Sequence, residues 1–203
     1  MFDAKIRPLI DPPLDRLGGL LARFNVSANH VTLLGVMAGL ASAGAIVGGQ
    51  HGVALALIVV SRLLDGLDGA VARATTPTDL GGYFDILGDF VFYVSIPVAF
   101  AIADSANALA AAVLIASFTL TGISFLAYAV IAAKRNLQTQ AHGKKSFFYS
   151  TGLAEGTETI IAFTAMCLMP NYFAPIALTF AALCFVTVIQ RSFFAYCSFS
   201  NSS

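Results

Sequence analysis

Residues 30–49, HVTLLGVMAGLASAGAIVGG, decide the fold class, because they have the length and composition of a helix that crosses a membrane. The stretch holds no Asp, Glu, Lys or Arg, and a bilayer core is spanned by about 20 apolar residues. Outward from it, further stretches of the same kind follow. The six predicted spans are residues 30–49, 53–73, 82–103, 106–133, 147–169 and 172–196.

The composition of the whole chain agrees with this assignment. Its 203 residues are 58% hydrophobic and 11% charged, whereas a soluble domain has about 25% charged residues. The formal net charge is zero, which gives no reason to expect a nucleic-acid partner. We therefore predict an all-α integral membrane bundle of six transmembrane helices over residues 29–203, with glycines at 35, 39, 44 and 48 allowing close helix packing.

Residues 1–28 form a separate juxtamembrane segment that mixes leucines and isoleucines with charges of both signs. This pattern predicts an amphipathic helix that lies in the membrane interface. A partly disordered tail is the alternative, because Pro12-Pro13 and Gly18-Gly19 weaken a helix.

The basic residues predict how the bundle is oriented. If both termini lie on one side of the membrane, nearly all Lys and Arg residues fall on that side, and the positive-inside rule makes it the cytoplasm. These residues are Lys5, Arg7, Arg16, Arg23, Arg73, Lys134, Arg135, Lys144, Lys145 and Arg191.

Four carboxylates lie where the second and third predicted spans meet the cytoplasmic side: Asp65, Asp68, Asp85 and Asp89. A charged residue deep in a bilayer costs about 2.5–3.5 kcal/mol, so such residues usually serve a function. The i, i+3 and i, i+4 spacings place each pair on one helix face, and the short turn between the spans lets the two faces meet. Clustered carboxylates favour hard cations such as Mg²⁺, Mn²⁺ or Ca²⁺, and paired cations serve displacement at phosphorus.

Two other interpretations are weighed against a catalytic site. The acids could cap helix ends and pair with Arg62 and Arg73, which would explain two of the four. The chain could also be a small cation transporter or channel that uses the carboxylates as its ion site. A transporter explains neither Arg73 nor the position of every acid at one interface rather than at the bilayer midplane.

The sequence DGLDGAVAR at residues 65–73, followed after a short turn by GGYFDILGD at 81–89, resembles the signature of the CDP-alcohol phosphatidyltransferase family, in a poorly defined bacterial branch. The six-span layout also fits that family. The resemblance implies that Asp65, Asp68 and Asp85 bind two divalent cations, Mg²⁺ or Mn²⁺, and that Asp89 is the general base and also touches metal. It further implies that the CDP group is held by Asn29, Thr32, Gly69, Ala72, Arg73 and Gly81, although Ala28 replaces the usual proline of the family before Asn29.

The reaction implied by the resemblance transfers a phosphatidyl group from a CDP-activated lipid, such as CDP-diacylglycerol, to an alcohol acceptor, with release of CMP. This is a step of phospholipid biosynthesis, and it would place the chain among membrane lipids in a bacterial inner membrane, with the active site and both termini cytoplasmic. A homodimer is left open.

The alcohol acceptor is not named by the sequence. Ionisable residues at the entry of the last two spans predict an acceptor pocket, in which the glutamates bind hydroxyls and the basic groups bind any acceptor phosphate. Pairing of the glutamates with the basic residues has equal weight. The residues concerned are Lys144, Lys145, Glu155, Glu158 and Arg191.

Overall fold

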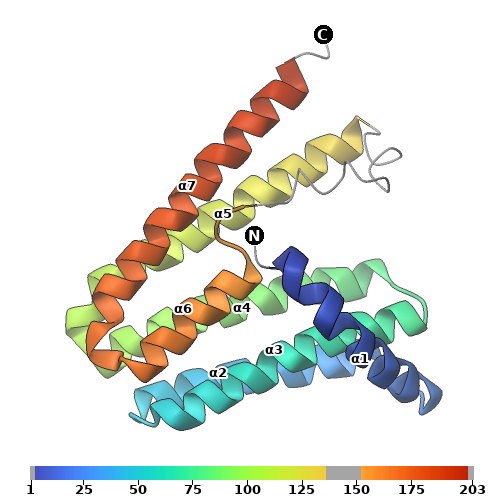
Figure 1. Cartoon of the computed structure of the whole chain (residues 1–203), viewed down its shortest axis with the longest axis horizontal. Helices are drawn as coiled ribbons and strands as arrows, with labels where there is room; N and C mark the ends of the chain where they lie inside the picture. The colour runs from blue at the N-terminus through green and yellow to red at the C-terminus, as the bar shows by residue number, and fades with distance from the viewer. Residues whose placement is uncertain (1–2, 136–151, 201–203) are drawn as a thin grey trace.

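The computed structural model describes residues 3–135 and 152–200, which form helices without a strand. Within these ranges, seven α-helices follow one another, with short 3₁₀ turns before the fifth and the last (Figure 1). Their bounds are α1 Asp3–Arg23, α2 Ala28–Val47, α3 His51–Ala74, α4 Asp79–Ala103, η1 Ser105–Asn107, α5 Ala108–Lys134, α6 Gly156–Leu168, η4 Pro170–Tyr172 and α7 Phe173–Ser200.

Helices α2 to α7 correspond to the six predicted spans, and four of them are long and apolar enough to cross a membrane: α2, α4, α5 with η1, and α7 with η4. Helix α3 has 24 residues but carries Arg62, Asp65, Asp68 and Arg73 between its middle and its end. Helix α6 has only 13 residues, and the predicted start of that span lies outside the described residues. Four of the six predicted spans are therefore supported by a helix that is long and apolar enough to cross a membrane.

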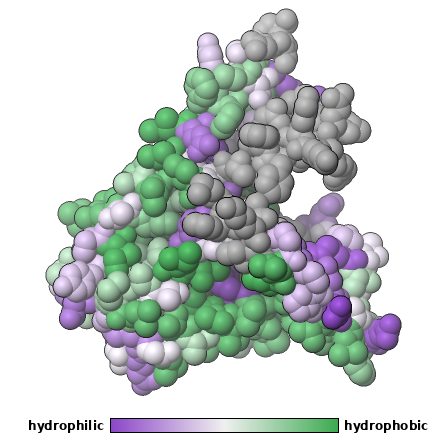
Figure 2. Space-filling view, in the orientation of Figure 1, coloured by the Kyte–Doolittle hydropathy of each residue, from purple (hydrophilic) through white to green (hydrophobic). Residues whose placement is uncertain are grey.

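The outer surface of the bundle is apolar. Large hydrophobic side chains point outward along α2, where Leu33 is 57% exposed and Met37 is also 57% exposed. Hydrophobic residues cover much of the face in Figure 2, and hydrophilic residues gather toward α1 on its right-hand side. Such a surface is suited to lipid, so the chain has the character of a multi-pass membrane protein.

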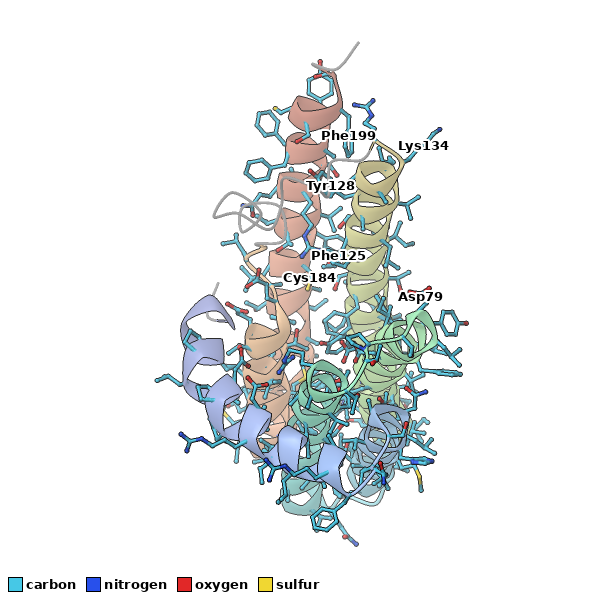
Figure 3. All side chains as sticks on the ribbon, turned by 90° about the vertical axis from the view of Figure 1, so that its right-hand side faces the viewer. Asp79, Phe125, Tyr128, Lys134, Cys184 and Phe199 are labelled. Carbon is cyan, nitrogen blue, oxygen red and sulfur yellow. The ribbon has the colours of Figure 1, made fainter. Side chains whose placement is uncertain are left out.

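The bundle has two groups of closely packed helices. Helix α2 packs most extensively on α3 and α4, and α5 packs on α7, while contacts of α4 with α5 and of α3 with α6 join the two groups. Figures 1 and 3 show α5 and α7 side by side along their length. Buried aromatic rings fill the junction: the ring of Phe92 meets that of Phe163 at 5.6 Å, and Phe100 stacks on Phe173 at 4.5 Å.

Glycines bring the helices of the first group together, as the sequence predicts for Gly35 and Gly39. The Gly35 carbonyl accepts a hydrogen bond of 2.8 Å from the buried Ser61 hydroxyl of α3. A Cβ on Gly39 would stand 3.0 Å from the Phe92 ring of α4. The prediction is wrong for Gly44 and Gly48, because a Cβ on either would meet no atom of another helix within 4 Å among the described residues.

Helix α1 lies across α3, as Figure 1 shows. It ends in a turn at Asn25, whose positive φ of 56° redirects the chain into α2. Asparagine tolerates this left-handed conformation better than most residues. The turn places the beginning of α2 beside the end of α3, at the end of the bundle that carries the predicted site.

Candidate active site

Helices α3 and α4 position the four aspartates. A short turn joins them, and Thr78 caps α4 by accepting a hydrogen bond of 3.1 Å from the backbone N–H of Gly81. The start of α4 is thereby fixed, and Asp85 and Asp89 follow on one helix face. Both helices pack on α2 and make few direct contacts with each other. Gly88 of α4 sits against a Val36 methyl group of α2, with room for no side chain of its own.

Arg62 links the two helices. Its Nη1 atom donates a hydrogen bond of 2.6 Å to Oδ1 of Asp89 and lies 3.6 Å from Oδ1 of Asp65. The guanidinium lies over the Phe92 ring, 3.9 Å from its centroid, and Nη2 donates to the Ser61 hydroxyl at 3.3 Å. Arg62 therefore balances part of the acidic charge, as the pairing interpretation expects for two of the acids.

Arg73 does not pair with an acid of the motif. Its guanidinium instead bonds to Asp15 of α1, because α1 crosses α3 at this point. The pairing interpretation thus accounts for Asp65 and Asp89 through Arg62, whereas within the described part of the chain Asp68 and Asp85 form no ion pair with a basic side chain.

Asp68 is the most buried of the four acids, with 4% of its surface exposed. Thr32 of α2 lies within hydrogen-bonding reach of its carboxylate, yet Oδ2 is buried and makes no hydrogen bond within the described structure. A buried carboxylate oxygen normally has a partner. A cation would supply one, and the donors gathered here are hard oxygens of the kind that Mg²⁺ or Mn²⁺ prefers.

The four carboxylates are near enough for their charges to act on one another, with Asp65 acted on by each of the other three. Among the described residues, however, no three acidic, His or Cys side chains are grouped closely enough to hold a metal ion. Arg62 lies between Asp65 and Asp89 in this arrangement, and α3 and α4 are separated by their packing on α2. The residue types fit a cation, and their roles as ligands stay a prediction.

Most residues predicted to hold the CDP group meet at the same end of the bundle. A Cβ on Gly81 would stand 3.3 Å from Oδ1 of Asn29, so the starts of α2 and α4 approach closely. A Cβ on Gly69 would stand 3.3 Å from Nη1 of Arg73. Ala72 lies between these on α3 and is half-buried.

A pocket of about 300 Å³ opens beside Asn29. Of its lining residues, the sequence predicts only Asn29 to hold the CDP group, because the others lie in or beside two turns that are distant in the chain. Thr78 carries a recognisable signal as an N-cap residue, and the rest carry none. The pocket is lined by Ala22, Asn25, Val26, Ser27, Ala28, Asn29, Thr75, Thr76 and Thr78.

The residues predicted to bind the acceptor are partly engaged in holding the backbone. Glu155 caps α6 and accepts a hydrogen bond of 2.9 Å from the N–H of Gly152, and Glu158 accepts one of 3.3 Å from the N–H of Glu155. Together they form a capping box. Arg191 of α7 donates a hydrogen bond of 3.1 Å to the Thr121 carbonyl. Its guanidinium also interacts electrostatically with Glu155. Lys144 and Lys145 lie outside the described residues.

Comparison with known proteins places this geometry in a family. Inner membrane protein YnjF of Escherichia coli is 41% identical over 197 residues, which cover 97% of this chain and 96% of that protein. Archaetidylinositol phosphate synthase of Pyrococcus horikoshii is 35% identical over 83 residues, covering 40% of this chain and 44% of that protein.

A solved structure shares the fold. It is Mycobacterium tuberculosis phosphatidylinositol phosphate synthase (PgsA1) with CDP-DAG bound, which superposes with a TM-score of 0.70 over 90% of this chain and 93% of that one, at 20% identity. The family model described as CDP-alcohol phosphatidyltransferase matches residues 25–190. The chain belongs to the CDP-alcohol phosphatidyltransferase family.

Proposed function

We propose that the chain transfers a phosphatidyl group from a CDP-activated lipid, of which CDP-diacylglycerol is the leading candidate, to an alcohol acceptor, and releases CMP. One observation carries the proposal: four acids from α3 and α4 are near enough for their charges to act on one another, and Arg62 bridges two of them, at the end of the bundle that also holds the Asn29 pocket. The fold relative solved with CDP-DAG supports the class of donor. The product would be a membrane phospholipid.

We assign Asp65, Asp68 and Asp85 as the metal triad, which with Asp89 would hold two divalent cations, Mg²⁺ or Mn²⁺. When bound, such cations neutralise the oxygens of a diphosphate and so favour departure of CMP. The unsatisfied Oδ2 atom of Asp68 supports this assignment, as does the mutual repulsion that the acids would otherwise experience.

The residues around the metal triad would hold the nucleotide. Arg73 and Gly69 offer a cation beside a backbone without a side chain, which lets a phosphate approach closely. Asn29 and Gly81 lie against each other where the starts of α2 and α4 meet. The pocket beside Asn29 is large enough for a polar ring of the nucleotide. Thr32 of α2 lies within hydrogen-bonding reach of the Asp68 carboxylate.

Asp89 would accept the proton of the acceptor hydroxyl. Its side chain is 33% exposed, so a substrate can reach it, and Arg62 holds Oδ1 in a fixed place. The hydroxyl oxygen forms a bond to the lipid-side phosphorus, the bond from that phosphorus to the CMP oxygen breaks, and the proton moves to the carboxylate.

The location we propose is a bacterial inner membrane with the active site and both termini on the cytoplasmic side. The full-length likeness to inner membrane protein YnjF supports the membrane, and the distribution of Lys and Arg supports the orientation. Helix α1 would lie in the interface, where its exposed Leu9 and Leu17 can enter lipid.

Acceptor binding is assigned to the region of Glu155, Glu158 and Arg191. Because both glutamates also cap α6, the substitution of Glu158 by Gln separates the two roles: the amide oxygen can still accept the backbone hydrogen bond but brings no charge. A raised acceptor KM with an unchanged CDP-lipid KM supports acceptor binding. Unchanged constants for both substrates assign Glu158 to the helix start alone.

The proposed activity is tested by incubating the purified protein with CDP-diacylglycerol, Mg²⁺ or Mn²⁺ and a panel of free and phosphorylated polyols. CMP release and a new lipid mass with at least one alcohol are expected, and Asp65→Ala serves as the inactive control. Absence of CMP release with every acceptor and both cations contradicts the proposal. Cation flux into proteoliposomes in that case would favour the transporter interpretation.

A further inference from the structure

Helix α1 packs closely on α3 along residues 65–73, which carry the first two aspartates of the motif. A Cβ on Gly18 would stand 2.7 Å from the carbonyl carbon of Ala70, and one on Gly66 would stand 2.8 Å from a methyl group of Leu14. The two helices therefore approach through a glycine from each side. Leu14 and Gly18 are one turn apart on α1, and Gly66 and Ala70 are one turn apart on α3, so the contact fixes the register of one helix on the other.

This contact places Asp15 against the end of α3. Oδ1 of Asp15 accepts hydrogen bonds from Nε of Arg73 at 3.2 Å and from Nη2 at 2.8 Å. The remaining nitrogen, Nη1, lies beside Gly69, 3.3 Å from the place where a Cβ would stand. One edge of the guanidinium is thus held by α1, and the third nitrogen lies over the motif.

The pair is poorly suited to a stabilising role. The side chains of Arg73 and Asp15 are 56% and 52% exposed, and an ion pair exposed to this degree contributes little to stability. Two donors of one guanidinium edge that share the same carboxylate oxygen, however, restrict the orientation of the guanidinium plane. The geometry is that of a pair in which Asp15 orients the Arg73 side chain and adds little to the stability of the fold.

We infer that Asp15 is a positioning residue for the donor site: it holds Arg73 so that Nη1 faces the place where a phosphate of the CDP group would lie over Gly69. The inference rests on the proposed function, since it assumes that Arg73 contacts the CDP group. It makes α1 part of the donor site, through Arg73, in addition to any contact that the helix makes with lipid.

The first test measures binding of CDP to the detergent-solubilised protein in the presence of Mg²⁺. Asp15→Asn is expected to raise the Kd about 2–5-fold, which corresponds to the coupling of an exposed charge pair. In the double variant with Arg73→Ala, the Kd should be no higher than in Arg73→Ala alone, because Asp15 acts through Arg73. Asp11→Asn, one turn earlier on α1, is the matched control and should leave the Kd unchanged.

The second test moves α1 without touching the charges. Gly18→Ala places a methyl group against the Ala70 backbone, whereas Gly19→Ala meets nothing within 4 Å. Both substitutions give the same gain in helix propensity. Gly18→Ala should therefore raise the Kd for CDP and Gly19→Ala should not, while both proteins stay folded by thermal unfolding.

Several results would overturn the inference. An unchanged or lowered Kd in Asp15→Asn would do so, as would effects of Asp15→Asn and Arg73→Ala that simply multiply. Equal behaviour of Gly18→Ala and Gly19→Ala would remove the role of the helix contact. Failure of the proposed function gives a different result, since the unaltered protein would then show no CMP release and Arg73→Ala would bind CDP as well as the unaltered protein does.

Discussion

Replacing Arg62 by Met should destabilise the protein, because the carboxylate of Asp89 then loses its basic partner. Arg62 is 12% exposed and holds Asp89, which is 33% exposed. Methionine retains the apolar contact with the Phe92 ring but removes the positive charge and the hydrogen bond of 2.6 Å. The carboxylate of Asp89 then lies in a partly buried place beside Asp65, without its cation.

The expected loss lies between two limits. Breaking a buried ion pair costs about 3–5 kcal/mol, and breaking an exposed pair costs less than about 1 kcal/mol. Because Asp89 is one-third exposed, we expect about 2–3 kcal/mol for Arg62→Met. For a chain of this size, this corresponds to a fall in the melting temperature of about 4–12 °C, which thermal unfolding in detergent can measure.

Arg73→Met is the matched control, because it removes an arginine from the same helix but from an exposed pair. Its cost should stay below about 1 kcal/mol. The double variant Arg62→Met with Asp89→Asn should regain part of the loss, because a neutral amide leaves no unpaired charge. The reasoning is refuted if Arg62→Met is no less stable than Arg73→Met, or if Asp89→Asn brings no recovery.

Three further predictions concern the proposed site and its side of the membrane. Substituting any member of the metal triad by Ala should abolish CMP release and weaken binding of Mn²⁺, which calorimetry can measure; full activity in all three variants would exclude the two-cation site. Asp89→Asn should slow turnover at least about 100-fold, as measured by kcat, while the Kd for CDP changes little; a normal rate would exclude Asp89 as the base. In a variant without the native cysteines, Cys at Gln50 or Asn107 should react with an impermeant reagent from outside intact cells, and Cys at Thr76 only after lysis; labelling at Thr76 from outside would reverse the orientation.

The sequence was sufficient to predict the helices and the local arrangement of the acids. Long apolar runs leave few alternatives to helices in a bilayer, and the i, i+3 spacing of Asp65 and Asp68 places both on one face of α3. The pair between Arg62 and Asp65 also follows from spacing along one helix. Features that depend on neighbouring residues of one helix could therefore be predicted from the sequence.

Contacts between distant segments could not be predicted in the same way. Asp15 and Arg73 are 58 positions apart, and nothing in the residues around Asp15 distinguishes it from Asp11. Their meeting depends on the crossing of α1 over α3, which in turn depends on glycines whose neighbours are known only in three dimensions. The length of α6 was also misjudged, because apolar composition alone does not reveal that Glu155 and Glu158 start the helix at Gly156.

The grouping of the helices has a consequence for how such a protein can change during evolution. The residues assigned to the donor lie on α2, α3 and α4, and α2 packs more extensively on α3 and α4 than either of these packs on the later helices; those assigned to the acceptor lie on α6 and α7, although α6 packs on α3 as extensively as on α7. Substitutions along α7 can therefore accumulate with less disturbance of the acids beside Arg62 than substitutions at Phe163 of α6, whose ring meets the Phe92 ring under Arg62. One inherited half could then serve many alcohols, each selected by a different second half, and chimeras joined between α4 and α5 offer a direct way to exchange them.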